Sequence, residues 1–382
     1  MEKLSGNELV ALISSVFPRF ESDRKMGILV DIPRNDSQDN NNWQKRREIC
    51  QNWYDELRNA AGSLGLEQID LIAYPDVKSN NADLPDSGYL ITGSLPERES
   101  GLPEVGVLTK FSEIFKDHQI FLAPTEYSTT APLKNNAKKY GFRAATMPGF
   151  SDMMIPALRI DYNEVFRRVE LIKNLLDPAE KAEVVFVVDE VNEYVMDFDL
   201  RFRKSHMSSG RFPDPSTAGN LPSGETYIVP YEGEGEKSRT NGTLPVQTGD
   251  DVLFYSIIEN NAVEVLGSGD SLKYEADFLN SEPAYGNMAE LGFGVLGDFG
   301  LEPINEILLD EKLGFHVAFG RSDHFGGIIS PDKFSAPDKV IHLDRVYIPK
   351  MQPRVSVKSI ILHFQDRDPE LIFENGNYTI FN

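Results

Sequence analysis

The chain has 382 residues, of which 40% are hydrophobic and 26% are charged, the composition of an ordinary globular protein. Its formal net charge of −22 would repel phosphate backbones, so we expect no nucleic-acid partner. The longest apolar runs, such as VVFVV at 184–188, are far too short to cross a bilayer, so we expect no membrane partner.

The first 20 residues follow the pattern of an amphipathic helix. They lack the basic start, apolar stretch and small-residue cleavage site of a signal peptide. The single cysteine, Cys50, excludes an internal disulfide and lies in a helical pattern, where we expect a packed and inert thiol. These features favour a cytoplasmic protein.

Apolar runs alternate with helical patterns in the first half of the chain. Strands are expected at 26–33, 67–75 and 119–125, because each is a short apolar run bounded by turn or loop residues. A long helix is expected from about Trp43 to Ala61, after an Asn-rich loop and before a glycine. Strands that alternate with helices predict an α/β layer with a mainly parallel sheet.

The pattern changes near residue 180. A helical pattern that begins near Asp161 ends at Leu176, before an Asp-Pro pair. Beyond it, short β-branched and aromatic runs are separated by Gly, Pro, Asn and Asp, which is typical of a β-rich domain. Because the length exceeds one typical core, we expect an α/β protein of two domains. An N-terminal α/β domain would span 1–180, and a β-rich α+β domain that carries a metal site would span 181–382.

Three of the six histidines, His316, His324 and His342, lie in the second half, near acidic residues. His342 and Asp344 are two positions apart in a strand pattern, so their side chains would share one face, about 6.5–7 Å apart, within reach of the same cation or pair of cations. His316 lies in an apolar strand pattern, where a lone histidine is more often a packed core residue. His324 follows in a turn and would face either solvent or substrate.

Two carboxylates stand beside glycines further upstream. Glu225 precedes a strand pattern and Glu290 begins ELGFG; their ordinary interpretations are a solvated strand end and a helix end. Histidine, aspartate and glutamate without cysteine are the ligands of Zn, Mn, Co or Fe. The glycine-rich stretch at 292–297 lacks the preceding strand and following helix of a dinucleotide loop. A metal-dependent enzyme is therefore the leading hypothesis.

Four phrases, taken in order and with their approximate spacing, resemble the thermophilic metalloaminopeptidase family of the aminopeptidase T and aminopeptidase S type. They are GNLPSGETYIVPYEGE at 219–234, AELGFG at 289–294, LLDEKLGFHVAFGRS at 308–322 and IHLDRVYI at 341–348. The resemblance covers roughly residues 180–350. It implies a pair of divalent metal ions, Zn, Co or Mn, whose ligands in this chain would be Glu225, Glu290, His316, Asp323, His342 and Asp344.

The resemblance also assigns roles to individual residues. The family usually has a tyrosine shortly after its first histidine, and Asp323 takes that place here, so we expect it to act as a ligand with altered electrostatics. Glu311 matches the family phrase and is expected to contact the ligands rather than the metal. Glu225 is expected to be the catalytic base that takes the proton of a water molecule.

The activity implied is removal of N-terminal residues from short peptides, by a homodimer whose active sites face an enclosed space. Two alternatives stay open. A ring-opening dioxygenase that acts on a dihydroxypyridine shares this fold family and keeps a His-x-Asp pair on a single iron. A metal-stabilised binding protein without catalysis would keep the same scaffold. Metal content and substrate turnover separate the three hypotheses.

Overall fold

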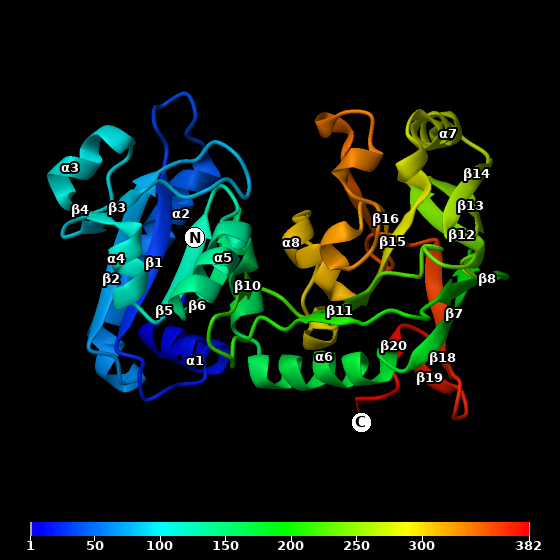
Figure 1. Ribbon diagram of the computed structural model, residues 1–382, viewed down its shortest axis with the longest axis horizontal. Coiled ribbons are helices and arrows are strands. Elements are labelled where there is room, and N and C mark those ends of the chain that lie inside the picture. Colours follow the sequence, from blue (N-terminus) through cyan, green and yellow to red (C-terminus); the bar gives the residue numbers. More distant parts are fainter. Residues whose placement is uncertain (1, 382) are drawn as a thin grey trace. The chain divides into compact units, whose positions relative to one another are not determined.

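The computed structural model describes residues 2–381, which form two compact units (Figure 1). The first unit extends up to Phe166 and also contains Gly210–Ser223; the second contains Arg167–Ser209 and the residues from Gly224 onward. The change from the first unit to the second therefore falls within α6 (Tyr162–Leu176), whereas the sequence placed it near residue 180. The later segment belongs to the first unit because its strand β10 pairs in parallel with β6.

A seven-stranded sheet forms the centre of the first unit, in the order β10-β6-β5-β1-β2-β3-β4. The strands from β10 to β2 are parallel, and β3 and β4 add an antiparallel pair at one edge. The mainly parallel sheet predicted from the sequence is confirmed, with the three expected strands as β1, β2 and β5. The seven strands of this sheet are β1 (Lys25–Ile32), β2 (Gln68–Pro75), β3 (Ser87–Ile91), β4 (Gly106–Lys110), β5 (Ile120–Thr125), β6 (Arg143–Pro148) and β10 (Ala218–Asn220).

Helices pack on this sheet through their apolar stripes. The side chain of Ser5 caps the first helix and Glu8 completes a capping box, while the Asn40 side chain accepts from the Trp43 N–H at 2.9 Å to begin the second. Phe115 and Leu133, from α4 and α5, pack with Phe121 of β5 in one aromatic and aliphatic core. The helices are α1 (Gly6–Val16), α2 (Asn41–Ala60), α3 (Leu102–Val105), α4 (Phe111–Asp117) and α5 (Thr130–Tyr140).

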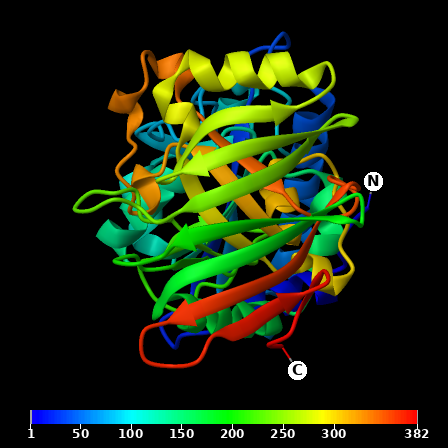
Figure 2. The same cartoon turned by 90° about the vertical axis from the view of Figure 1, so that its right-hand side faces the viewer.

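The second unit contains two antiparallel sheets, so the predicted β-rich character is confirmed. One has eight strands in the order β14-β13-β12-β8-β7-β18-β19-β20, which Figure 2 shows side by side. They are β7 (Ala179–Val188), β8 (Asn192–Asp199), β12 (Asn241–Thr248), β13 (Asp251–Ile258), β14 (Asn261–Gly267), β18 (Val355–Phe364), β19 (Glu370–Glu374) and β20 (Asn377–Tyr378). Helix α7 (Ser271–Ser281) lies next to β14.

The other sheet has five strands in the order β17-β16-β15-β11-β9. They are β9 (His206–Ser208), β11 (Glu225–Ile228), β15 (Met288–Gly294), β16 (Phe315–Gly320) and β17 (His342–Val346); the short helix α8 (Ile307–Asp310) precedes β16. Phe315 packs on Phe186 of β7 at 6.2 Å between ring centroids, and Phe319 packs on Tyr255 of β13 at 5.3 Å. One face of the five-stranded sheet is therefore core, and because side chains alternate along strands, the other face is available for a site.

Two smaller expectations are also confirmed. The N-terminal residues form an amphipathic helix that buries Leu9, Leu12, Ile13 and Val16. Cys50 is buried in α2, and burial raises the pKa of its thiol far above the usual range, so it lacks the thiolate needed for reactivity. Among the described residues, no helix combines the length and hydrophobicity needed to span a membrane.

Candidate metal centre

Strand register brings five of the six predicted ligands onto the face of the five-stranded sheet that does not carry the aromatic core. Glu225 on β11 lies opposite Gly294 on β15, and Gly292 on β15 lies opposite His316 on β16. Across the next pair, Ala318 is opposite Asp344 and Gly320 is opposite His342. Because opposed residues point the same way, four strands contribute polar side chains to one cluster on this face of the sheet.

Glycine at position 292 leaves the space that the imidazole of His316 occupies. A β-carbon built there would lie 2.0 Å from Nε2 of His316, a distance that no side chain tolerates. The imidazole therefore lies over β15 above Gly292, where it reaches Glu290 on that strand and Glu225 on β11 beyond it. His316 is 1% exposed, so the packed-core interpretation is correct about its burial but misses its polar neighbours.

The first candidate ligand group contains Glu225, Glu290 and His316, whose ligand atoms lie within 4.8 Å of one another. Nε2 of His316 is 3.2 Å from Oε1 of Glu290 and 3.8 Å from Oε2 of Glu225. All three residues are buried. Oε2 of Glu225 is buried without a hydrogen-bond partner among the described residues, and a cation would satisfy such an oxygen.

The second group contains Glu290, His342 and Asp344. Nε2 of His342 is 3.1 Å from Oε2 of Glu290 and 3.6 Å from Oδ1 of Asp344. Glu290 thus belongs to both groups, with one carboxylate oxygen toward each histidine. The predicted common face of His342 and Asp344 is confirmed, although metal binding by all six residues stays a prediction.

Backbone carbonyls fix the orientation of both histidines. Nδ1 of His342 is 2.9 Å from the carbonyl oxygen of Arg321, and Nδ1 of His316 is 3.3 Å from that of Gly314. A carbonyl can only accept, so Nδ1 carries hydrogen in each ring. The Nε2 atoms are consequently the ones free to bind a metal, which is the usual arrangement behind a histidine ligand.

The carboxylates and imidazoles stabilise each other as charges. Burial disfavours the charged form of both histidines, but Glu290 and its acidic neighbours outweigh this effect and raise the pKa of His316 to about 9 and that of His342 to about 11. Burial likewise disfavours the Glu290 carboxylate, but the hydrogen bonds with the two imidazoles hold its pKa well below the usual range. Protonated histidines therefore balance the carboxylates when no cation is bound.

Sequence reasoning missed Lys312, which is 1% exposed. Its Nζ lies 3.3 Å from Oε1 of Glu225 and also pairs with Glu311. Burial raises the pKa of Glu311 to about 7, with Lys312 opposing the shift and Glu225 and Asp344 adding to it. Glu311 was expected beside the ligands, and it contacts one of them through Lys312. The only signal was a lysine next to that glutamate in an otherwise apolar phrase.

Asp323 lies outside both ligand groups. Its carboxylate accepts from Nε of Arg321 at 2.5 Å, and its side chain is 30% exposed. The geometry therefore gives no support to its predicted role as a ligand, because a guanidinium two residues away already engages it. Its neighbour His324 is half-buried, and its ring lies edge to face against His342 with 5.6 Å between centroids.

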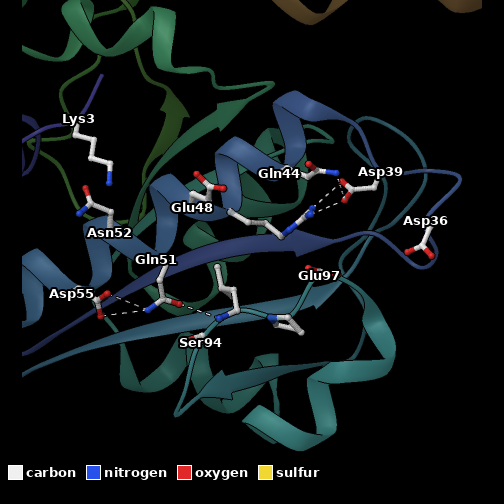
Figure 3. A pocket seen from close by; sticks show the side chains of 13 residues that line it. Lys3, Asp36, Asp39, Gln44, Glu48, Gln51, Asn52, Asp55, Ser94 and Glu97 are labelled. Atoms are coloured by element: carbon white, nitrogen blue, oxygen red, sulfur yellow. Dashed lines mark hydrogen bonds and ion pairs between the residues drawn. The ribbon is translucent and has the colours of Figure 1, made fainter. Parts of the chain in front are cut away.

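A separate cavity of about 710 Å³ lies in the first unit and contains none of these residues. Figure 3 shows its polar lining, in which the guanidinium of Arg47 binds both carboxylate oxygens of Asp39 at 3.0 and 2.7 Å. Gln51 contacts Asp55 and the backbone N–H of Leu95. These polar groups are satisfied by one another, so the cavity offers no chemistry comparable to that of the metal centre.

No family model matches the chain, and no curated protein matches it. Solved structures do match it over nearly their whole length. The 2,5-dihydroxypyridine dioxygenase from Pseudomonas putida has 14% sequence identity and a TM-score of 0.57, with 99% of this chain and 98% of that chain covered. AmpT from Thermus thermophilus has 11% identity and a TM-score of 0.54, with 98% and 99% covered. The chain shares their fold. At these identities, activity must be argued from the site itself.

Proposed function

We propose that this protein is a metal-dependent aminopeptidase that removes N-terminal residues from short peptides. The observation that carries the proposal is the position of Glu290, whose two carboxylate oxygens lie 3.2 and 3.1 Å from the Nε2 atoms of His316 and His342. A carboxylate shared between two ligand groups is the arrangement expected of a bridging ligand. It supports a pair of cations rather than one, as in two-metal hydrolases.

The ligand chemistry supports hard or borderline divalent cations. Only imidazole nitrogens and carboxylate oxygens are present, a set that suits Zn, Co or Mn. Glu225, Glu290 and His316 would hold one ion, and Glu290, His342 and Asp344 the other. When bound, such ions supply Lewis acidity toward the peptide carbonyl and lower the pKa of coordinated water.

Protein groups would supply the remaining steps. Glu225 is the proposed base, because Lys312 holds its Oε1 while Oε2 has no hydrogen-bond partner among the described residues. The buried ammonium of Lys312 fixes that carboxylate in place and adds positive charge beside a developing oxyanion. The AmpT neighbour carries the name of the aminopeptidase T type that the sequence phrases resemble, which adds support. From the resemblance we also propose a homodimer. The single cysteine and the N-terminal residues, which do not follow a signal-peptide pattern, lead us to propose a cytoplasmic location.

A mononuclear metalloenzyme of the dioxygenase type is the second candidate. Two observations favour it: the shared fold with 2,5-dihydroxypyridine dioxygenase, and the ammonium of Lys312, which already neutralises part of the first ligand group. Glu290, His342 and Asp344 would then hold a single iron, a ligand set with open positions. A binding protein without catalysis would use the same residues for stability only.

Metal content and turnover, measured on one sample purified without chelator, test the proposal. We expect two metal ions per chain by inductively coupled plasma mass spectrometry, and release of N-terminal residues that EDTA abolishes and Zn, Co or Mn restores. One iron per chain with oxygen consumption on 2,5-dihydroxypyridine would replace the peptidase by the dioxygenase. Bound metal without either turnover, together with a lower melting temperature in EDTA, would leave the binding protein.

A further inference from the structure

Strand β17 carries two candidate ligands and is also the free edge of its sheet. It pairs with β16 on one side, and no other described strand pairs with it on the other. The carbonyl of Ile341 accepts from the N–H of Arg321, and the N–H of Tyr347 donates to the carbonyl of Phe315. Odd-numbered residues of β17 therefore direct their backbone groups toward β16.

It follows from this alternation that the N–H and C=O groups of His342 and Asp344 point away from β16. No strand among residues 2–381 accepts them. Their side chains meanwhile face the metal centre. Two residues that are two positions apart in a strand lie about 6.5–7 Å from each other. Their N–H and C=O groups form one complete hydrogen-bonding repeat with which an added strand can pair.

A groove of about 570 Å³ runs beside this edge, between β17 and α7. That volume lies within the usual range for ligand pockets, about 300–1,000 Å³. Tyr274 and Phe278 of α7 form one wall with nearly parallel rings, and Ile341 contributes from the strand. Tyr274 is 69% exposed, so its ring is accessible from the groove.

The groove is rigid and nearly neutral. Arg345 of β17 pairs with Glu275 of α7 at 3.1 Å, and the hydroxyl of Tyr255 donates to the same carboxylate at 2.7 Å. These contacts fix the helix against the strand and cancel the charge of Glu275. The rings of Phe278 and Tyr285 stack at 4.4 Å and support the aromatic wall from behind. A rigid apolar wall favours an apolar side chain and lowers the ordering cost of binding.

We propose that this edge and groove bind the substrate peptide as an added β-strand. The peptide backbone pairs with the N–H and C=O groups of His342 and Asp344, its N-terminus lies at the metal centre, and an apolar side chain downstream of the scissile bond packs on Tyr274 and Phe278. The occupant is the substrate because His342 belongs to both the groove and the ligand set. This inference rests on the proposed function and assigns its substrate class: extended peptides of at least three residues with an apolar residue after the first.

Hydrogen-exchange mass spectrometry tests the backbone pairing directly. The probe is a tetrapeptide with leucine first and phenylalanine third, whose first amide is replaced by a reduced, uncleavable bond. We expect slower exchange within residues 340–346 when the peptide is added to the purified protein. A matched peptide with N-methylated downstream amides should give no protection, because its N-methyl groups remove its donors and prevent the close approach of its carbonyls to the N–H groups of the strand edge.

Kinetics on a variant test the groove. In Tyr274→Ala we expect kcat/KM for the unmodified tetrapeptide to fall by roughly tenfold more than kcat/KM for leucine p-nitroanilide, which has no downstream peptide. Phe202→Ala is the matched control, because Phe202 is 74% exposed in the same unit and does not line the groove. The control should behave as the parent on both substrates.

The outcomes separate the two proposals. Protection by the peptide without hydrolysis of any peptide would reject the aminopeptidase and leave the binding groove standing. Hydrolysis without protection, or with equal protection by the N-methylated peptide, would overturn the groove and leave the aminopeptidase. Protection that grows with protein concentration in the absence of peptide would show that a second copy of the chain covers this edge, and would also overturn the inference.

Discussion

The substitution Gly292→Ala gives a sharp test of the metal centre, because it adds one carbon atom and removes no candidate ligand. The new β-carbon would lie 2.0 Å from Nε2 of His316, whereas ordinary contacts begin at 3.4 Å. The imidazole or the strand must therefore move by about 1.4 Å, while metal–ligand distances tolerate only about 0.2 Å. We expect His316 to lose its position in the first ligand group.

The expected magnitude follows from related perturbations. Changes that only misorient a metal ligand typically cost about 10–100-fold in affinity, so at least that loss is expected at the Glu225 side of the centre. Overpacking should also lower the unfolding free energy of the metal-free protein by about 1–3 kcal/mol. The second group should keep its metal, because His342 and Asp344 lie on β17, which β16 separates from the strand of Gly292.

Isothermal titration with Zn or Co, combined with thermal unfolding in EDTA, measures both effects. Gly62→Ala is the control, since a β-carbon there meets nothing within 4 Å, and it should leave both metal affinities unchanged. A Gly292→Ala protein that binds two ions with parental affinity would refute the reasoning. In that case His316 would be a buried partner of Glu290 and not a ligand.

Four further predictions address the same centre. Glu290→Gln should lower the affinity for both metal ions, whereas His342→Ala should remove only the ion of the second ligand group. Measured metal content that shows full occupancy of both sites in both variants would contradict the shared-ligand geometry. Metal binding should release up to two protons, because His316 and His342 are protonated up to about pH 9 and 11 without metal. The metal affinity should therefore rise by roughly tenfold per pH unit for each proton displaced. Titrations in buffers of different ionisation enthalpy count the released protons, and a release of zero protons would contradict the prediction. The same raised pKa of His316 stabilises the metal-free fold fully below about pH 6.5, and that contribution is lost as the pH rises through about 9, which pH-dependent unfolding in EDTA measures. Asp323→Tyr should preserve or raise peptidase activity at little cost in stability, since Asp323 is part exposed and contacts Arg321; kcat/KM and melting temperature check this, and unfolding would show that residue 323 is not where the family tyrosine lies.

The sequence predicted the common face of His342 and Asp344, but it did not predict how residues of different strands meet. The two-residue spacing of His342 and Asp344 was sufficient, because a strand fixes their common face. The proximity of Glu225 and Glu290 to His316 depends on register between strands, which no local pattern specifies. Gly292 illustrates the difference: its role is visible only once the imidazole from the neighbouring strand lies over it.

The errors also have physical causes. Lys312 was overlooked because a lysine in a sequence is usually a solvated surface group, and only tertiary packing buries this one beside two carboxylates. Asp323 was placed in the ligand set by resemblance; its role as a ligand stays a prediction, and in the structure its carboxylate accepts a hydrogen bond from Arg321. The segment that contains β10 was assigned to the second domain because parallel pairing between distant residues leaves no periodic signal.

The geometry of β17 links recognition to catalysis through one property of a strand. Side chains of His342 and Asp344 face the ligand groups, while the backbone groups of the same two residues face the free edge. Strand residues rise by about 3.3 Å, so a peptide paired in register there would end within one or two residues of the ligand atoms. Contacts between the downstream part of the peptide and the side chains of Tyr274 and Phe278 would thereby help to position the scissile bond at the ligand groups. For this reason a longer peptide should have a higher kcat/KM than a dipeptide with the same first residue. Equal kcat/KM values for the two peptides would show that binding in the groove does not contribute to catalysis.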